Sequence, residues 1–126
     1  MKDSNIIKEK SFNFSIRIVN LYKYLTIQKK EFVLSNQVLR SGTSIGANIC
    51  ESTQSVSTAD FLSKLSISLK EACETEYWIK LLYRTEYIDK SQHDSVIFDC
   101  QELIKMLTSI IKKTKENLIN NNSDNF

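Results

Sequence analysis

Proline is absent from this 126-residue chain, and glycine occurs only twice, at Gly42 and Gly46. Sandwiches and barrels need a turn about every 8–12 residues, usually marked by Gly or Pro, so this scarcity argues against an all-β fold. The same scarcity argues against a glycine-rich phosphate loop and therefore against nucleotide-fold enzymes. With 41% hydrophobic and 25% charged residues, the composition is that of a globular protein. We therefore expect a single all-α domain.

Groups that carry catalysis are equally scarce. His93 is the only histidine, and the three cysteines, Cys50, Cys73 and Cys100, are widely spaced without a CxxC pair. This pattern favours buried, reduced cysteines over a zinc or redox site. A ferritin-like dimetal site needs two Glu-x-x-His motifs, but the residue three before His93 is Lys90. We expect no enzymatic activity, catalytic residue, metal, cofactor or small-molecule substrate.

Long apolar runs are also missing. No run approaches the 18 or so apolar residues of a membrane span, and the N-terminal residues contain no continuous apolar segment typical of a signal peptide. The sequence therefore predicts a cytoplasmic protein without membrane contact.

Hydrophobic residues instead recur at spacings of three and four, which predicts helices over about residues 6–28, 31–55, 57–85 and 91–119. The core face predicted for the first helix consists of Phe12, Ile16, Val19, Tyr22 and Leu25. That of the last helix consists of Val96, Cys100, Leu103, Leu107 and Ile110. Short connections between four long helices predict an antiparallel up-down-up-down bundle. The polar tails, residues 1–5 and 120–126, are expected to be disordered.

Three local features qualify this assignment. The stretch around Gly42 and Gly46 is poor in helix formers, which favours a loop. However, the two glycines are four residues apart, so a helix would place them in one small-residue seam where another backbone can pack closely. We predict the helix.

Ser57 followed by Asp60 resembles a capping box that begins the third helix, and Ser91 with Asp94 could begin the fourth.

The net charge of +2 is unevenly distributed. Residues 1–40 contain eight Lys or Arg and three Asp or Glu, whereas residues 41–102 contain five and ten. Basic residues in an up-down bundle would gather along the first helix and at the bundle ends, which suggests contact with a polyanion. Aromatic residues at helical spacing mostly belong to cores, but Tyr24 beside Lys23 and Trp78 near Lys80 are candidates for stacking on bases.

Three blocks carry a family resemblance: QVLRSGTSIGANICE at residues 37–51, DFLSKL at 60–65, and LKEACETEYW at 69–78. Together they resemble the Q-L-x-R-S-x-x-S-I-x-A-N-I-x-E, D-F-x-x-K-L and K-E-A-x-E-T-x-Y-W blocks of the four-helix proteins encoded within 23S rRNA intervening sequences. The match covers about residues 10–115. Cys50 and Ser52 depart from the usual Ala, which exchanges one small residue for another.

The resemblance implies an antiparallel four-helix bundle that assembles into rings, typically homopentamers, with no established enzymatic activity. A related branch, the accessory protein of diversity-generating retroelements, contacts reverse transcriptase and RNA. That branch tends to be more basic than this chain.

The signature also contains polar groups next to the apolar stripes. Because half-buried charges persist only when paired, we hypothesise that some form a network that fixes the second helix against the third or against a neighbouring subunit. The predicted interface and packing residues are Arg40, Gly42, Gly46, Asn48, Glu51, Asp60, Lys64, Glu71, Glu74 and Trp78.

Two functions follow as hypotheses. The first is a non-enzymatic oligomeric scaffold, pentameric by resemblance, that contacts structured RNA or a ribonucleoprotein such as the ribosome through basic patches. Its predicted RNA-binding residues are Lys8, Lys10, Arg17, Lys23, Lys29 and Lys30. The alternative is a protein–protein interaction module without nucleic-acid binding, for example a partner of a reverse transcriptase or another cytoplasmic protein, which would use the acidic third helix and the small-residue second helix.

Overall fold

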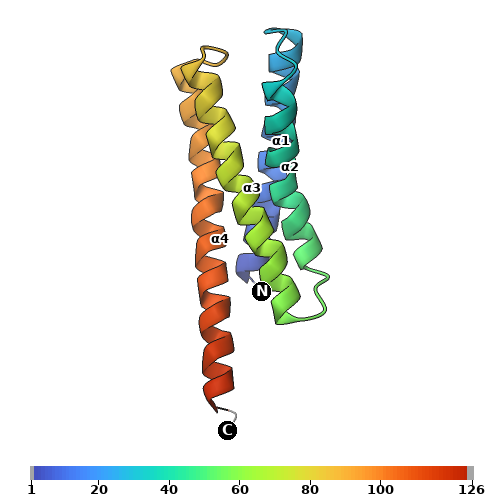
Figure 1. Ribbon diagram of the computed structural model, residues 1–126, viewed down its shortest axis with the longest axis vertical. Coiled ribbons are helices and arrows are strands. Elements are labelled where there is room, and N and C mark those ends of the chain that lie inside the picture. The colour runs from blue at the N-terminus through green and yellow to red at the C-terminus, as the bar shows by residue number, and fades with distance from the viewer. Residues whose placement is uncertain (1, 125–126) are drawn as a thin grey trace.

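The computed structural model describes residues 2–124, and the side chains of residues 5–121. Over this range the chain forms the helices α1 (Lys2–Ile27), α2 (Leu34–Ser52), α3 (Thr58–Arg84) and α4 (Lys90–Asp124). Successive helices run antiparallel (Figure 1). The predicted all-α, up-down four-helix architecture is therefore confirmed.

The four helices do not pack evenly. Among the four pairs of neighbouring helices, α2 and α3 form the most extensive contact and α1 and α4 the least extensive one. The longest helix, α4, projects beyond the others at the lower end of the molecule (Figure 1). We call that end, which holds both chain termini and residues 53–57, the terminal end. The opposite end, formed by residues 28–33 and 85–89, is the loop end.

The core confirms one predicted stripe and corrects another. Every residue of the stripe predicted for α4 is buried, from Val96 to Ile110. In α1 the predicted stripe was right for Leu25, which is buried, but wrong for Phe12 and Ile16, which are 67% and 48% exposed. The apolar residues that α1 buries are Ile7, Phe14, Ile18, Leu21 and Leu25. α1 carries apolar residues on two faces at helical spacing, so periodicity alone does not say which face is buried.

The cysteines show a similar difference. Cys100 is buried, as expected, and its thiol lies 3.4 Å from the carbonyl oxygen of Ala72. Cys50 and Cys73 are exposed, which corrects the expectation that all three lie in the core. They lie outside the buried stripes of α2 and α3, where a small side chain is tolerated without being packed.

Gly42 and Gly46 lie within the continuous helix α2, as predicted. A Cβ atom at Gly42 would lie 2.7 Å from Cγ1 of Ile18, and one at Gly46 would lie 3.2 Å from the backbone oxygen of Ser11. α1 therefore packs against α2 at distances that a larger residue would prevent, and the seam is filled from within the chain.

The start of α3 is capped as predicted, whereas the start of α4 is capped by other residues than those predicted. Ser57 Oγ accepts the backbone N–H of Asp60 at 3.0 Å, which confirms the cap of α3. α4 begins earlier than Ser91. The carboxylate of Asp89 accepts the N–H of Gln92, and the Gln92 side chain accepts the N–H of Asp89, both at 2.8 Å. This reciprocal pair is the capping box, and a cap by Ser91 was wrong.

Glu31 determines where α2 begins. Its carboxylate accepts the backbone N–H groups of Val33, Leu34 and Ser35 at 3.1, 2.7 and 2.8 Å. Burial raises the pKa of this carboxyl, but the hydrogen bonds from Leu34, Ser35 and Val33 outweigh burial, so the pKa lies below its ordinary value. The helix starts at Leu34 and ends at Ser52, shorter at both ends than predicted.

At the chain ends, helix covers residues 2–5 and 120–124, which the sequence predicted to be disordered. Neither segment contains Gly or Pro, and Asn is only mildly unfavourable in a helix, so no local signal ends α1 or α4 there. Residues 1, 125 and 126 of the predicted tails lie outside the described residues. Within residues 2–124, none of the helices combines the length and apolar character needed to cross a membrane.

Candidate functional site

Two of the six predicted RNA-binding residues are engaged within the molecule. Lys10 Nζ lies 3.1 Å from a carboxylate oxygen of Glu102. Arg17 donates to the carboxylate of Asp99 and to the hydroxyl of Ser95, each at 2.7 Å. These bonds join α1 to α4 across the seam with the fewest contacts, and they partly neutralise both cations.

The other four predicted residues present their charges to solvent. Lys8, Lys23, Lys29 and Lys30 are exposed, and none of them forms an ion pair with the described side chains of residues 5–121. Lys8 lies near the terminal end, whereas the other three lie at or next to the loop end. The antiparallel arrangement also brings the start of α4, with Lys90, to the loop end, as the sequence predicted (Figure 1).

Tyrosines accompany these lysines at the loop end. A hollow of about 330 Å³ is lined by Tyr24, Lys29, Tyr83, Glu86, Tyr87, Ile88, Asp89 and Gln92. Lys29 Nζ lies over the ring of Tyr24, 5.9 Å from its centroid. The ring of Tyr83 packs on that of His93 with centroids 4.7 Å apart. Tyr24 was a stacking candidate from the sequence. Its proximity to Tyr83, Tyr87 and His93 was not predicted, because the loops at residues 28–33 and 85–89 are distant in the chain.

The backbone of both loops departs from helical geometry at a charged residue. Lys30 has a φ of 54° and Glu86 a φ of 69°, in the left-handed region where glycine is favoured. The N–H of Tyr87 donates to the carbonyl of Leu82 at 2.9 Å and so closes the last turn of α3. Each loop therefore has a charged residue, Lys30 or Glu86, at its left-handed position.

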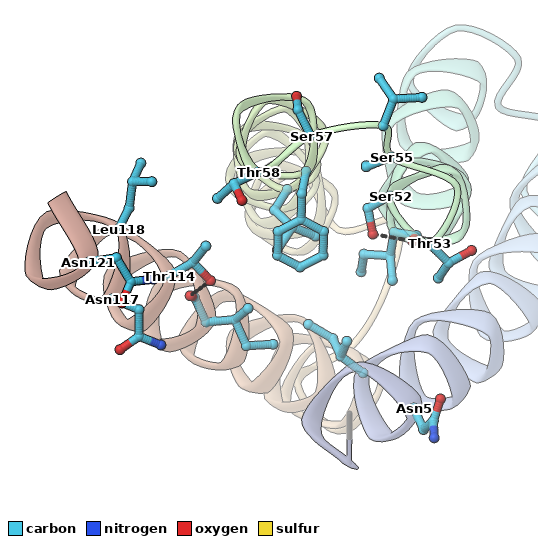
Figure 2. Close-up of a pocket in the computed structure, with 16 residues that line it drawn as sticks. Asn5, Ser52, Thr53, Ser55, Ser57, Thr58, Thr114, Asn117, Leu118 and Asn121 are labelled. Atoms are coloured by element: carbon cyan, nitrogen blue, oxygen red, sulfur yellow. Dashed lines mark hydrogen bonds between the residues drawn. The ribbon is translucent and has the colours of Figure 1, made fainter. Parts of the chain in front are cut away.

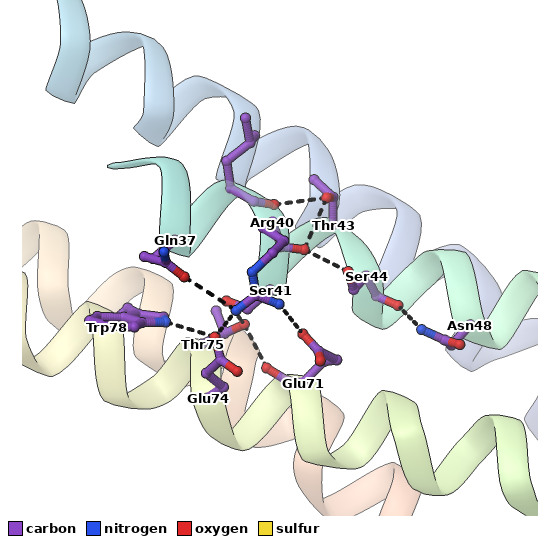
Figure 3. Close-up of polar contacts among 11 residues, drawn as sticks. Gln37, Arg40, Ser41, Thr43, Ser44, Asn48, Glu71, Glu74, Thr75 and Trp78 are labelled. Carbon is purple, nitrogen blue, oxygen red and sulfur yellow. Dashed lines mark hydrogen bonds and ion pairs between the residues drawn. The ribbon is translucent and has the colours of Figure 1, made fainter. Parts of the chain in front are cut away.

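A polar network joins α2 to α3 (Figure 3). Arg40 lies between two carboxylates of α3, 3.2 Å from Glu71 and in direct contact with Glu74. Gln37 accepts from Arg40 at 3.4 Å, and the indole N–H of Trp78 donates to Glu74 at 3.0 Å. Arg40 and Glu71 therefore face each other, which is the arrangement the network hypothesis requires.

The remaining members of the predicted network behave differently from one another. Lys64 lies 3.4 Å from Glu51 and forms a second bridge between α3 and α2. Asn48 does not cross to α3, because its amide donates to the carbonyl of Ser44 in its own helix at 2.8 Å (Figure 3). Asp60 takes part in capping α3, with its carboxylate 3.3 Å from the N–H of Val56.

Sequence reasoning missed the buried hydroxyls of this seam. Thr75 donates to the hydroxyl of Ser41 at 2.9 Å, and Ser68 donates to the backbone oxygen of Ile45 at 2.8 Å. All three hydroxyl residues are buried. The seven-residue spacing of Ser68 and Thr75 in α3 places them on the same face, and that spacing was the available signal.

A hollow lies at the terminal end, between α4 and the loop that joins α2 to α3 (Figure 2). It measures about 660 Å³ and has an apolar floor that includes Ile49 and Leu65. Its rim carries the hydroxyl and amide groups of Asn5, Ser52, Thr53, Ser55, Ser57, Thr58, Thr114, Asn117 and Asn121. Among the side chains of residues 5–121, those that line this hollow are uncharged.

A second hollow lies on the outer side of α1 and α2 and is lined in part by the exposed face of α1. It measures about 530 Å³ and is lined by Asn5, Lys8, Glu9, Phe12, Ser15, Thr43, Gly46 and Ala47. We call this surface the α1–α2 groove. Phe12, with its ring largely exposed, and Ala47 make it apolar, and Ile16 continues the apolar surface along α1.

These features define a class of protein: a four-helix bundle tied by cross-helix ion pairs, with lysines and tyrosines at one end. Among the described side chains, no group of three or more His, Cys, Asp or Glu residues is arranged to hold a metal ion. The chain belongs to the 23S rRNA-intervening sequence protein family, whose model matches residues 3–109.

A solved structure supports this membership. The crystal structure of a protein with unknown function from the S23 ribosomal protein family of Bacteroides thetaiotaomicron is similar to this chain, with 59% identity and a TM-score of 0.86. The similarity covers 87% of this chain and 98% of that one. No curated protein matches the chain.

Proposed function

We propose that the protein is a non-enzymatic, oligomeric scaffold that contacts structured RNA, free or within a ribonucleoprotein, through the loop end. The observation that carries this proposal is the group of exposed lysines Lys23, Lys29 and Lys30, which have no carboxylate partner among the described side chains. Unpaired lysines bind phosphates with release of counterions, so the binding is expected to depend strongly on salt and weakly on sequence.

The self-association in this proposal is supported by the α1–α2 groove. Single exposed apolar residues are normal on a protein surface, but Phe12 and Ile16 lie one helical turn apart beside a hollow with a mostly apolar lining. A homopentamer, the assembly implied by the family resemblance, would cover this surface with a neighbouring subunit.

The RNA contact is tested by a salt titration with a labelled RNA hairpin. The variant Lys23→Gln/Lys29→Gln/Lys30→Gln is compared with wild type and with Lys70→Gln/Lys105→Gln/Lys112→Gln, which removes three exposed lysines of α3 and α4. For three lost phosphate contacts, the slope of log K against log salt should become shallower by about 2–3. An unchanged slope in the loop-end variant, or an equal change in the control variant, contradicts the proposal.

A second candidate function is a protein–protein interaction module without nucleic-acid binding, and the α1–α2 groove favours it. Gly46→Leu does not test this function, because the new side chain would strike α1 at Ser11 and disturb the bundle itself. Ala47→Lys changes the exposed surface of the groove without entering the core. Absence of RNA binding by the wild-type protein at low salt, combined with loss of a protein partner such as a reverse transcriptase in Ala47→Lys, would favour this function.

A further inference from the structure

We propose that the loop end is a binding site for unpaired nucleotides, in which the ring of Tyr24 stacks on a base and Lys29 contacts the adjacent phosphate. This inference rests on the proposed function and specifies which part of an RNA the loop end would bind. It predicts a preference for single-stranded segments over duplex.

The first support is the composition of the loop-end hollow. Three tyrosines, Tyr24, Tyr83 and Tyr87, line a hollow of about 330 Å³, within the range of pockets that hold small molecules. All three are half-buried, so each ring is fixed by packing while part of it faces solvent. Rigid aromatic rings next to lysines are a common means of binding single strands, because every base offers a face for stacking.

The second support is the position of Lys29 over Tyr24. An exposed ammonium over a tyrosine ring is held only weakly, and a base that stacks on the ring would displace it at little cost. The displaced ammonium would remain within reach of the phosphate that follows the base. One residue thus covers the ring in the free protein and neutralises the ligand in the complex.

The acidic residues of the hollow restrict the expected phosphate contact to the side of the hollow that carries Lys29 and Lys30. The carboxylate of Asp89 is engaged by the N–H of Gln92. Asp94, which lies farther along α4 and does not line the hollow, pairs with Lys90 at 2.6 Å. Glu86 has no such partner among the described side chains and lies in the loop after α3. A phosphate is therefore expected beside Lys29 and Lys30, on the α1 side of the hollow, and away from Glu86.

The test compares a labelled oligoadenylate with the duplex that it forms with oligouridylate, measured by fluorescence anisotropy at one salt concentration. Tyr24→Leu should weaken oligoadenylate binding by about 5- to 100-fold and leave duplex binding within twofold. Tyr24→Phe, which keeps the ring, should bind as wild type does. Tyr22→Leu, at a half-buried tyrosine of the same helix outside the hollow, serves as the matched control. Circular dichroism of each variant verifies that the bundle has folded.

The outcomes separate this inference from the proposed function. One outcome is that Lys23→Gln/Lys29→Gln/Lys30→Gln binds both probes more weakly while Tyr24→Leu binds oligoadenylate as wild type does. In that case the RNA contact stands and the stacking site is wrong. Equal affinity of the wild-type protein for oligoadenylate and duplex also overturns the stacking site. If the wild-type protein binds neither probe nor the hairpin, the proposed function fails, and the stacking site fails with it.

Discussion

The cap formed by Glu31 permits a quantitative prediction, because one side chain satisfies three backbone N–H groups at the start of α2. In Glu31→Gln, one oxygen can still accept from Val33 and Leu34, but the second becomes an amide that faces the N–H of Ser35. Leaving that buried donor unpaired costs about 1–3 kcal/mol. Losing a negative charge at a helix N-terminus costs about 0.3–1 kcal/mol more. We expect a total loss of about 1–4 kcal/mol of unfolding free energy at pH 7.

The pH dependence of this loss has a definite direction. Because the folded-state pKa of Glu31 lies below its ordinary value of 4.5, the contribution of the carboxylate is complete above that pH. It is lost as the pH falls below 4.5 through the folded-state pKa. The difference in stability between wild type and Glu31→Gln should therefore be constant near neutrality and narrow in acid.

Urea unfolding followed by circular dichroism, at pH 7 and at several values below 4.5, measures both effects. Glu116→Gln is the matched control, because Glu116 is an exposed carboxylate of α4, and it should change stability by less than about 0.5 kcal/mol. Equal stability of Glu31→Gln and wild type at pH 7, or a difference that grows in acid, would refute the assignment of Glu31 as the cap.

Two further predictions concern packing. Gly42→Ala should destabilise the bundle by about 1 kcal/mol in urea unfolding. The reason is that the clash of the new Cβ with the fully buried Ile18 should outweigh the gain in helix propensity. A variant more stable than wild type would show that α1 yields at this contact. Burial raises the pKa of Cys100 to about 12, so at pH 8 iodoacetamide should alkylate Cys50 and Cys73 in the native protein and Cys100 only in urea. Mass spectrometry counts the adducts, and rapid native labelling of Cys100 would contradict its burial.

The fold was largely predictable because its signals are local. The 4-3-4-3 spacing from Val96 to Ile110 identifies a buried helix face without any knowledge of its neighbours, and it was confirmed in full. The glycine seam was predictable for a different reason: the four-residue spacing of Gly42 and Gly46 places both on one face of a helix, where their small size permits close packing. The buried face of α1 was not predictable, because Phe12 and Phe14 belong to two competing stripes and only the position of α2 and α4 decides between them.

The candidate site was less predictable because it depends on contacts between distant segments. The lysines of the α1–α2 connection were identified from charge alone. Their association with Tyr83 and Tyr87 required the antiparallel arrangement, which brings residues 28–33 beside residues 85–89. Charge counting also could not distinguish Arg17, which is engaged by Asp99, from Lys30, which is not.

The central claim, an assembly of several chains that holds RNA, is tested most directly by native mass spectrometry of the protein purified from its host, before and after ribonuclease treatment. We predict a particle that is a multiple of the 14.6 kDa chain and that loses additional mass when the RNA is digested. A single chain of 14.6 kDa whose mass is unaffected by ribonuclease would contradict both the self-association and the RNA contact.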